Sequence, residues 1–350
     1  MHLKRSLKIA AGLLACASLA SADTFFVTNF GVNTITKYDA NGNGSAFTGA
    51  FVNGPNGVAL DSIGNLYVTT NNNTIEKFAP NGTDLGVFAS TGLNFALGLA
   101  FDRNGNLYAA NNGTNTVEVF TPNGTDLGVF ANVIRPTGLA FDAAGNLYVA
   151  NSGSTIARFA PDGTPLSSFT SSNLNNPEGL AFDSLGFLYV ANSASDSIQI
   201  LSAAGVDLGS LVSPNLSGPI GLAFDSASNL YAVNSLSAKI AKFSPDNTDT
   251  IFASTGFSPA FIAVQRTPTL VNISTRLRVL TGDNVLDGGF IVLGTGTKTL
   301  LIRGLGPSLA GAGVTGTLAD PILELHSGSN NTIIAANDNW KNNQQAEIQA

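Results

Sequence analysis

The chain is organised by one short pattern of apolar and polar positions, seen most clearly at residues 137–151. Residues 138–141 (Gly-Leu-Ala-Phe) are apolar throughout, as expected of a strand that is covered on both faces. Residues 142–146 contain the Asp and Gly that are typical of a tight turn. Residues 147–151 (Leu-Tyr-Val-Ala-Asn) are rich in the residue types that favour strands. The pattern predicts a β-hairpin.

Two further strands complete the predicted unit, and the whole unit repeats. Residues 155–159 and 166–169 have strand-like composition and are joined by the turn Pro161-Asp162-Gly163. The aspartate of the first turn recurs about every forty residues, at Asp61, Asp102, Asp142, Asp183 and Asp225. A period near forty that consists of four short strands predicts a β-propeller.

The number of repeats sets the expected architecture. Strands of the 147–151 type begin six times, at Phe25, Leu66, Leu107, Leu147, Leu188 and Leu230. Strands of the 138–141 type also begin six times, at Gly57, Gly98, Gly138, Gly179, Gly221 and Phe261. The two sets are offset, so the last strand of the array can pair with the first and leave no open sheet edge. We therefore expect an all-β fold with a six-bladed β-propeller over residues 23–266.

The forty-residue period stops at Arg266, and residues 269–350 have a different pattern. Apolar segments separated by Gly, Asp and Asn predict strands at 270–274, 276–280, 289–293, 299–303, 322–326 and 332–336. We expect a small β-sandwich-like domain. The chain stops at residues 347–350, after a polar segment and with no sign of a closing strand. We therefore also expect this domain to be incomplete and the sequence to be a fragment.

Residues 1–22 have the pattern of an export signal, with a basic start, an apolar middle and the small residues Ala20-Ser21-Ala22 before Asp23. The apolar run is too short to cross a bilayer. Residues 13–16 offer a second processing site, a lipobox that would leave a lipid on Cys16. Both routes predict a secreted, periplasmic or cell-surface protein. Because Cys16 is the only cysteine, we expect no disulfide.

The charge balance narrows the choice of partners. The chain has 16 Lys and Arg against 23 Asp and Glu, a net charge of −7, and only 11% charged residues. A nucleic-acid partner is disfavoured because phosphate binding needs a basic patch. Loops that are rich in Asn, Ser and Thr and poor in charge favour a neutral partner, either a protein or a glycan. We expect the propeller itself to be a monomer.

Residues 177–183 (Pro-Glu-Gly-Leu-Ala-Phe-Asp) followed by 188–192 (Leu-Tyr-Val-Ala-Asn) resemble the NHL repeat and the six-bladed propellers of the SMP-30/gluconolactonase type. The SMP-30 resemblance implies a lactonase or lyase that holds one calcium or other divalent ion at the mouth of the central channel. NHL repeats usually have Asp where this chain has Asn29, Asn111, Asn151, Asn192 and Asn234, with Thr70 in the second unit. Residues 269–350 resemble a module of large secreted bacterial proteins.

The candidate site follows from the residues just before each inner-strand glycine or its equivalent, which are Asn56, Leu97, Thr137, Glu178, Ile220 and Ala260. A hard cation takes about six oxygen ligands. Three of these positions are apolar and only one is a carboxylate, so Asn56 and Glu178 are the metal ligands only under the enzyme alternative. Otherwise we expect Asn56, Arg135, Thr137 and Glu178 to form a ligand-binding group at the channel mouth, where Arg135 and Glu178 can pair.

Other chemistry has little support in the sequence. His326 is the only histidine outside residues 1–22 and lies in the other domain, so the propeller cannot contain a Ser-His-Asp triad. Residues 39–44 resemble the opening of a calcium loop, but Ala50 stands where the twelfth-position carboxylate belongs, and a hairpin turn is the simpler explanation. We therefore predict an exported, non-enzymatic binding or scaffold propeller. The alternative is a metal-dependent lactonase or lyase.

Overall fold

The computed structural model describes residues 23–49 and 51–266 with their side chains. Beyond them it describes the backbone of six strands, which are β25 (Leu270–Arg276), β26 (Asp287–Val292), β27 (Thr299–Ile302), β28 (Leu323–His326), β29 (Ile333–Asn337) and β30 (Ala346–Gln349). The predicted export signal at residues 1–22, including Cys16, and the calcium-loop position Ala50 lie outside the described residues. The chain from Pro268 onward belongs to a second compact unit.

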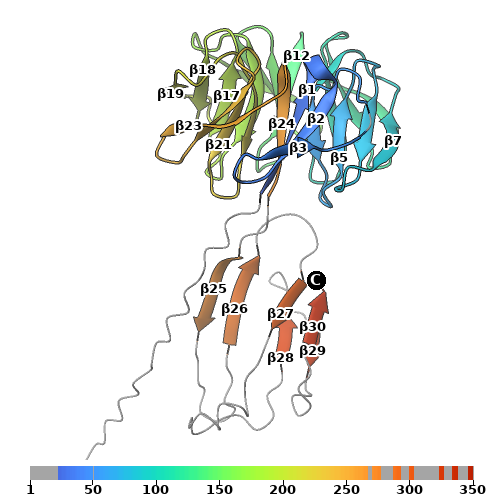
Figure 1. The fold of residues 1–350 in the computed structure, drawn as a ribbon, viewed down its shortest axis with the longest axis vertical. Coiled ribbons are helices and arrows are strands. Elements are labelled where there is room, and N and C mark those ends of the chain that lie inside the picture. Colours follow the sequence, from blue (N-terminus) through green and yellow to red (C-terminus); the bar gives the residue numbers. More distant parts are fainter. Residues whose placement is uncertain are drawn as a thin grey trace, which may run out of the picture. The chain divides into compact units, whose positions relative to one another are not determined.

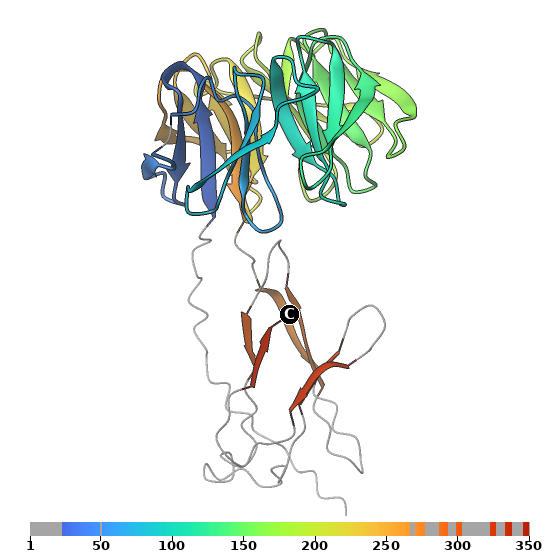
Figure 2. The ribbon, with the colours of Figure 1, turned by 90° about the vertical axis from the view of Figure 1, so that its right-hand side faces the viewer.

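Six four-stranded antiparallel sheets make up the first unit, which is a six-bladed β-propeller (Figure 1, Figure 2). We number the blades in chain order, and in each the inner strand is named first. Blades 1 to 3 are β24 (Pro259–Gln265), β1 (Thr24–Asn29), β2 (Thr34–Tyr38) and β3 (Gly44–Ala46); β4 (Val58–Leu60), β5 (Leu66–Thr69), β6 (Ile75–Phe78) and β7 (Asp84–Ala89); and β8 (Ala96–Phe101), β9 (Leu107–Asn111), β10 (Thr116–Phe120) and β11 (Asp126–Asn132). Blades 4 to 6 are β12 (Pro136–Phe141), β13 (Leu147–Asn151), β14 (Thr155–Phe159) and β15 (Pro165–Thr170); β16 (Pro177–Phe182), β17 (Leu188–Asn192), β18 (Ser197–Leu201) and β19 (Asp207–Val212); and β20 (Pro219–Phe224), β21 (Leu230–Asn234), β22 (Lys239–Phe243) and β23 (Asp249–Ser254).

The ring closes as the offset of the two strand sets predicts. The last propeller strand, β24, lies beside β1 and pairs with it antiparallel, with Phe25 opposite Val264 and Val27 opposite Ile262 (Figure 1). Blade 1 is therefore built from both ends of the propeller chain. The predicted pairing of residues 261–264 with the strand at Phe25 is confirmed.

The inner strands differ from the prediction at their start. In five blades the strand begins two residues before the predicted glycine or its equivalent, as at Pro136 in β12. The cause is a β-bulge: Pro136 pairs with Asn151, but Leu139 pairs with Val149, so the register shifts between them. A bulge adds a residue without changing the hydrophobic pattern, so the sequence pattern alone placed the start too late.

The recurring aspartate fixes the turn between the first two strands of a blade. In blade 4, Asp142 Oδ1 accepts hydrogen bonds from the backbone N–H of Ala144 at 2.8 Å and of Asn146 at 2.9 Å. Asp142 Oδ2 accepts from Asn146 Nδ2 at 2.8 Å and from the Tyr148 hydroxyl at 3.3 Å. Burial opposes ionisation, but these donors hold the pKa of Asp142 below its usual value. One carboxylate thus organises the whole turn, which explains why it marks the repeat.

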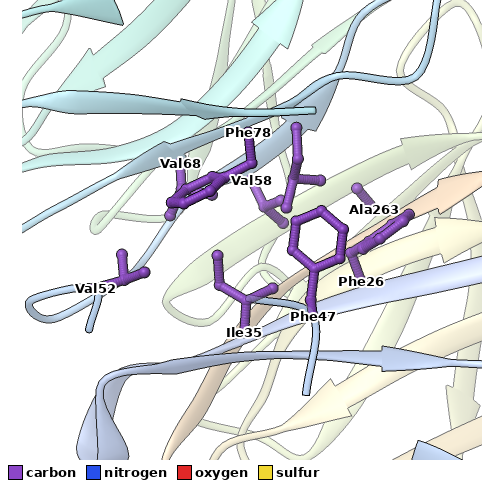
Figure 3. Packing of buried hydrophobic residues seen from close by; sticks show 9 residues of the cluster. Phe26, Ile35, Phe47, Val52, Val58, Val68, Phe78 and Ala263 are labelled. Carbon is purple, nitrogen blue, oxygen red and sulfur yellow. The ribbon is translucent and has the colours of Figure 1, made fainter. Parts of the chain in front are cut away.

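The hydrophobic core lies between neighbouring blades. Figure 3 shows the cluster between blades 1 and 2, where Phe26 and Phe47 pack toward Val58 and Phe78. A Tyr–Phe contact recurs at four later interfaces: the tyrosine of the second strand meets the phenylalanine of the next inner strand edge-on, with ring centroids 4.9–5.0 Å apart, in the pairs Tyr67–Phe101, Tyr108–Phe141, Tyr148–Phe182 and Tyr189–Phe224. Edge-to-face geometry suits the charge distribution of aromatic rings.

The second unit contains three described strand pairs, β25 with β26, β28 with β29, and β27 with β30. Of the predicted strand at 276–280, only Arg276 lies among the described residues, and it ends β25. The prediction of no closing strand after residue 341 is wrong, because Ala346–Gln349 forms β30 and Ile348 pairs with Leu300. This segment has low intrinsic strand preference, and its pairing partner rather than its composition makes it a strand.

Candidate functional site

The six positions before the inner-strand glycines or their equivalent lie next to one another around the ring. The glycine of one blade packs directly on a backbone carbonyl of the next: a Cβ on Gly138 would lie 2.1 Å from Glu178 O, and one on Gly179 would lie 2.1 Å from Ile220 O. Similar approaches join the other blades up to Gly221, whose Cβ would lie 2.9 Å from Ala260 O. Glycine is therefore required here because the backbones touch.

Thr137 is a structural member of this ring. Its side chain is buried, and its hydroxyl lies 3.0 Å from the carbonyl oxygen of Pro177 in blade 5 and 3.2 Å from that of Ala150 in its own blade. A hydroxyl has a single proton to donate, so both acceptors compete for it. Thr137 therefore ties blade 4 to blade 5, and its polar atom is occupied within the propeller.

Two further threonines, which the sequence analysis did not single out, have the same role. Thr28 Oγ1 accepts from Phe261 N–H at 3.0 Å and donates to Asn56 O at 2.5 Å. Thr69 Oγ1 accepts from Gly57 N–H at 2.7 Å and donates to Leu97 O at 3.0 Å. The sequence does distinguish these two threonines, because they are polar whereas the equivalent residues of the other blades are apolar: Ala110, Ala150, Ala191 and Val233.

Glu178 is the carboxylate of the ring. It is half-buried, and its Oε1 accepts a hydrogen bond from Asn176 Nδ2 at 2.9 Å. Burial raises its pKa to about 7, although the Asn176 hydrogen bond and the positive charge of Arg135 both act in the opposite direction. The group therefore changes charge near neutral pH, which is the range in which a carboxyl can donate or accept a proton.

Arg135 lies at the start of the neighbouring blade and is exposed. Its backbone is in the left-handed region, with φ of 48°, and is held there by two contacts: its N–H donates to Asn115 Oδ1 at 2.7 Å, and its carbonyl accepts from Ser152 N–H at 3.1 Å. The guanidinium charge acts on Glu178. The structure thus places the predicted pair of charged residues in adjacent blades.

Asn56 lies in a blade that is not adjacent to that of Glu178. It belongs to blade 2, whereas Glu178 belongs to blade 5, on the opposite side of the six-membered ring. Its carbonyl accepts from Thr28, and its N–H donates to Thr69 O at 3.0 Å. The four predicted site residues therefore fall into two places, with Arg135, Thr137 and Glu178 in adjacent blades and Asn56 across from them.

Buried asparagines at the ends of three second strands have a structural role. In blade 3, Asn111 is fully buried, donates from Nδ2 to Gly92 O at 2.6 Å and accepts at Oδ1 from Asn94 N–H at 3.2 Å. Asn192 and Asn234 repeat this arrangement in blades 5 and 6. A carboxylate could accept but not donate, so only the amide satisfies both partners.

The residues present do not fit a site for a hard divalent cation. Within residues 23–49 and 51–266, no three His, Cys, Asp or Glu side chains are grouped so that they could hold a metal. Of the six ring positions, only Glu178 is a carboxylate, and Leu97, Ile220 and Ala260 offer no side-chain oxygen. Asp39, in the segment that resembles a calcium loop, uses its carboxylate to accept from Asn41 N–H, Asn43 N–H and Asn43 Nδ2 at 2.8–2.9 Å, which is the geometry of a hairpin turn.

Comparison with known proteins establishes the fold. No family model and no curated protein matches the sequence. A chain of a nidogen/laminin complex is 19% identical over 69% of this chain and 98% of its own, with a TM-score of 0.63. A streptogramin B lyase is 17% identical over 76% and 87%, with a TM-score of 0.51, and a gluconolactonase from Xanthomonas campestris is 21% identical over 60% and 79%, with a TM-score of 0.54.

These similarities define the class of protein: the chain is a six-bladed β-propeller, similar in fold to proteins of both binding and enzymatic function. The particular resemblance to NHL repeats and to the SMP-30 type stays a prediction. Among the described residues, the structure contains no helix with the length and apolarity needed to cross a bilayer.

Proposed function

We propose that this chain is an exported, non-enzymatic propeller of the NHL type that binds a protein or glycan partner. The proposal is supported by the residues at the six positions before the inner-strand glycines or their equivalent, which we call the inner ring. Three of its six positions are apolar, and the Thr137 hydroxyl is occupied by backbone carbonyls of its own and the next blade. Arg135 and Glu178 provide adjacent charges at the start of two inner strands, suited to contact with a bound molecule rather than to coordination of an ion.

The nidogen/laminin complex supports the same reading by analogy of fold. The similar chain there is part of an assembly of two proteins. A propeller presents a rigid disc whose loops can contact a partner without rearrangement, and rigid surfaces lose little entropy on binding. The low charge of the present chain favours a neutral partner.

The second candidate is a metal-dependent lactonase or lyase, in which Asn56 and Glu178 would hold calcium or another divalent ion. One observation favours it: the pKa of Glu178 is raised to about 7, as is useful in acid–base catalysis. The presence of only one carboxylate and three apolar residues among the six ring positions argues against it, because a hard cation takes about six oxygen ligands. The folds of the streptogramin B lyase and the gluconolactonase are compatible with either function.

Thermal unfolding of the full chain, with millimolar calcium and with a chelator, separates the two candidates. A ligand that binds only the folded state stabilises it by RT ln(1 + [L]/Kd), about 2.7 kcal/mol at a hundredfold excess over Kd. We expect the same melting temperature in both conditions. A calcium-dependent rise that is lost in Glu178→Ala and kept in the control Glu76→Ala would overturn the binding proposal in favour of the enzyme.

We propose that residues 1–22 direct export. Mass spectrometry of the exported chain tests this and distinguishes the two processing routes: cleavage after Ala22 leaves Asp23 as the first residue, whereas the lipoprotein route leaves an acylated Cys16. An unprocessed chain that begins at Met1 would contradict both.

A further inference from the structure

Four large apolar side chains are exposed where the propeller closes. Val32, Phe51, Leu236 and Phe257 are 44%, 72%, 77% and 75% exposed, and they lie in the loops of blades 6 and 1 and in the connection from blade 1 to blade 2. We call these four residues the seam patch. Exposed apolar groups that gather in one place, unlike single ones, mark interaction surfaces.

The loops that carry the seam patch touch one another in sequence around the ring. Thr255 N–H donates to Ala238 O at 2.9 Å, which joins the Phe257 loop to the Leu236 loop. A Cβ on Gly256 would lie 2.9 Å from Val32 Cγ2, and Val52 N–H donates to Asn33 O at 3.3 Å, which joins Val32 to the loop of Phe51. The loops that carry the four side chains therefore adjoin one another on one surface.

The fold does not require Leu236 and Phe257 to be large and apolar, because most other blades build the same loops with small or polar residues. Phe257 precedes a left-handed residue at a position where four other blades have Asn53, Asn94, Asn175 and Ser217, and blade 4 has the exposed Ile134. Leu236 stands where blades 3, 4 and 5 have Gly113, Gly153 and Ala194. Leu236 and Phe257 thus differ from most of their counterparts at exposed positions.

A buried polar atom below the patch is also unsatisfied. In blades 3, 5 and 6 the Oδ1 atom of the buried asparagine accepts a backbone N–H from the preceding loop, as Asn192 does from Asn175 at 3.2 Å. The corresponding atom in blade 1, Asn29 Oδ1, is buried and has no hydrogen-bond partner among the described residues. The loop above it, residues 255–258, therefore lacks one hydrogen bond that its counterparts in blades 3, 5 and 6 have.

The seam patch lies on the face opposite to the points where the chain enters and leaves the propeller. Thr24 pairs with Gln265, and both stand at the end of blade 1 where the other blades have their Asp142-type turn. The patch lies at the other end of the strands, with the connections between blades. This face is therefore the one that the propeller presents away from its own flanking segments at residues 24 and 265.

We propose that the seam patch is a docking site for an apolar, uncharged segment of a partner protein. The loops at residues 30–33, 48–54, 235–238 and 255–258 contain no charged residue, although the chain as a whole has a net charge of −7. A charge-free apolar centre is typical of protein interfaces, and a charged group of the partner buried there would lose its hydration without gaining a counter-charge. This inference rests on the proposed binding function and assigns it a surface and a partner class.

The composition of the patch favours a protein over a glycan. Sugars are commonly recognised by side chains that combine a flat face with a polar edge, such as Trp and Tyr. The patch offers only Phe and aliphatic side chains, and the tyrosines at positions 38, 67, 108, 148 and 231 are buried in the core. Leu, Val and Phe instead match the apolar side chains of a peptide segment.

The test is selection of binders from a displayed library of random linear peptides on the full chain. Selected peptides are then measured against two matched variants. In Leu236→Ala/Phe257→Asn, both residues take the identity found in other blades, so the fold is preserved. In Arg135→Ala/Glu178→Gln, the charged pair of the inner ring is removed. Light scattering of the full chain over a range of concentrations accompanies these measurements.

We expect peptides rich in Leu, Ile and Phe and free of charge, with affinity reduced about tenfold or more by the seam variant and unchanged by the inner-ring variant. Peptides that respond only to the inner-ring variant would overturn this inference and leave the proposed binding function in place. Failure to select any specific peptide would contradict both. A concentration-dependent dimer that the seam variant abolishes would identify a second copy of this chain as the occupant and also overturn the inference.

Discussion

The buried carboxyl group of Glu118 on β10 shares a hydrogen bond with the carboxyl group of Asp126 on β11. The same position in blade 5 holds an amide, and Gln199 donates from Nε2 to Asp207. Glu118 can reproduce this bond only when it carries a proton. Burial first, and then the negative charge of Asp126 and their shared hydrogen bond, raise the pKa of Glu118 to about 7.

This pair predicts a loss of stability as the pH rises. Between the ordinary pKa of Glu, 4.5, and about 7, the folded chain holds a proton on Glu118 that the unfolded chain releases. The free energy of unfolding therefore falls with pH through this window. Glu118→Gln removes that dependence, so we expect it to stabilise the protein by about 1–2 kcal/mol at pH 8 and to change little at pH 4. Denaturant unfolding at both pH values measures this. Equal effects at the two pH values would refute it.

The buried asparagines predict a strong response to a change of one atom. Asn192→Asp keeps the size of the side chain but replaces the donor to Asn173 O by an acceptor. We expect a loss of about 1–3 kcal/mol of unfolding free energy at neutral pH, because two acceptors then face each other in a buried site. Asn151→Asp is the control, since Asn151 is only half-buried and donates to the Thr155 hydroxyl, which can itself donate instead. Similar losses in both variants would contradict this account.

The contact between inner strands predicts that Gly138 tolerates no side chain. A methyl group there would lie 2.1 Å from Glu178 O, so blades 4 and 5 would have to separate. We expect Gly138→Ala to lower the unfolding free energy by about 2 kcal/mol or more. Gly49→Ala serves as the control because nothing lies within 4 Å of its Cβ position. Thermal unfolding distinguishes the two, and a Gly138→Ala variant as stable as the control would show that the ring is looser than described.

One joint between blades lacks a hydrogen bond that others have. Asn33 Oδ1 accepts from Gly54 N–H at 2.7 Å, and Asn115 Oδ1 accepts in the same way from Arg135. The corresponding residue in blade 6 is Ala238, which has a left-handed backbone with φ of 54°. We expect Ala238→Asn to add the missing bond to Ser258 N–H and to suit this backbone better, stabilising the protein by about 1 kcal/mol.

The mirror substitution, Asn115→Ala, tests the same bond by removal, with an expected loss of about 1 kcal/mol in denaturant unfolding. A stabilisation by Ala238→Asn without a loss in Asn115→Ala would assign the gain to the backbone preference of Asn alone.

The fold was accessible from the sequence because its determinants are local and repeated. The apolar run at residues 138–141 and the turn at Asp142 recur at a constant spacing. The array begins with one strand type at Phe25 and ends with the other at Phe261, which predicted that the two pair and close the ring. The bulge at Pro136 was not accessible, because it changes the register without changing the pattern of apolar residues. Strand β30 was missed for a related reason: its pairing partner lies far away in the chain.

The candidate site was only partly accessible. The sequence placed Arg135 and Glu178 in consecutive repeats, and in the structure they lie in adjacent blades. It did not indicate that Thr137 is buried or that Thr28 and Thr69 have the same structural role, because their acceptors belong to other blades. The unsatisfied Asn29 was equally hidden, as its missing donor is a loop more than two hundred residues away in the chain.

The pairing of β1 with β24 has a mechanical consequence. Because Thr24 stands opposite Gln265 in an antiparallel pair, traction on the two flanking segments loads the outermost backbone hydrogen bond first and then each next one in turn. Heat must disrupt all the blade interfaces together, whereas tension on the two ends separates β1 from β24 one hydrogen bond at a time.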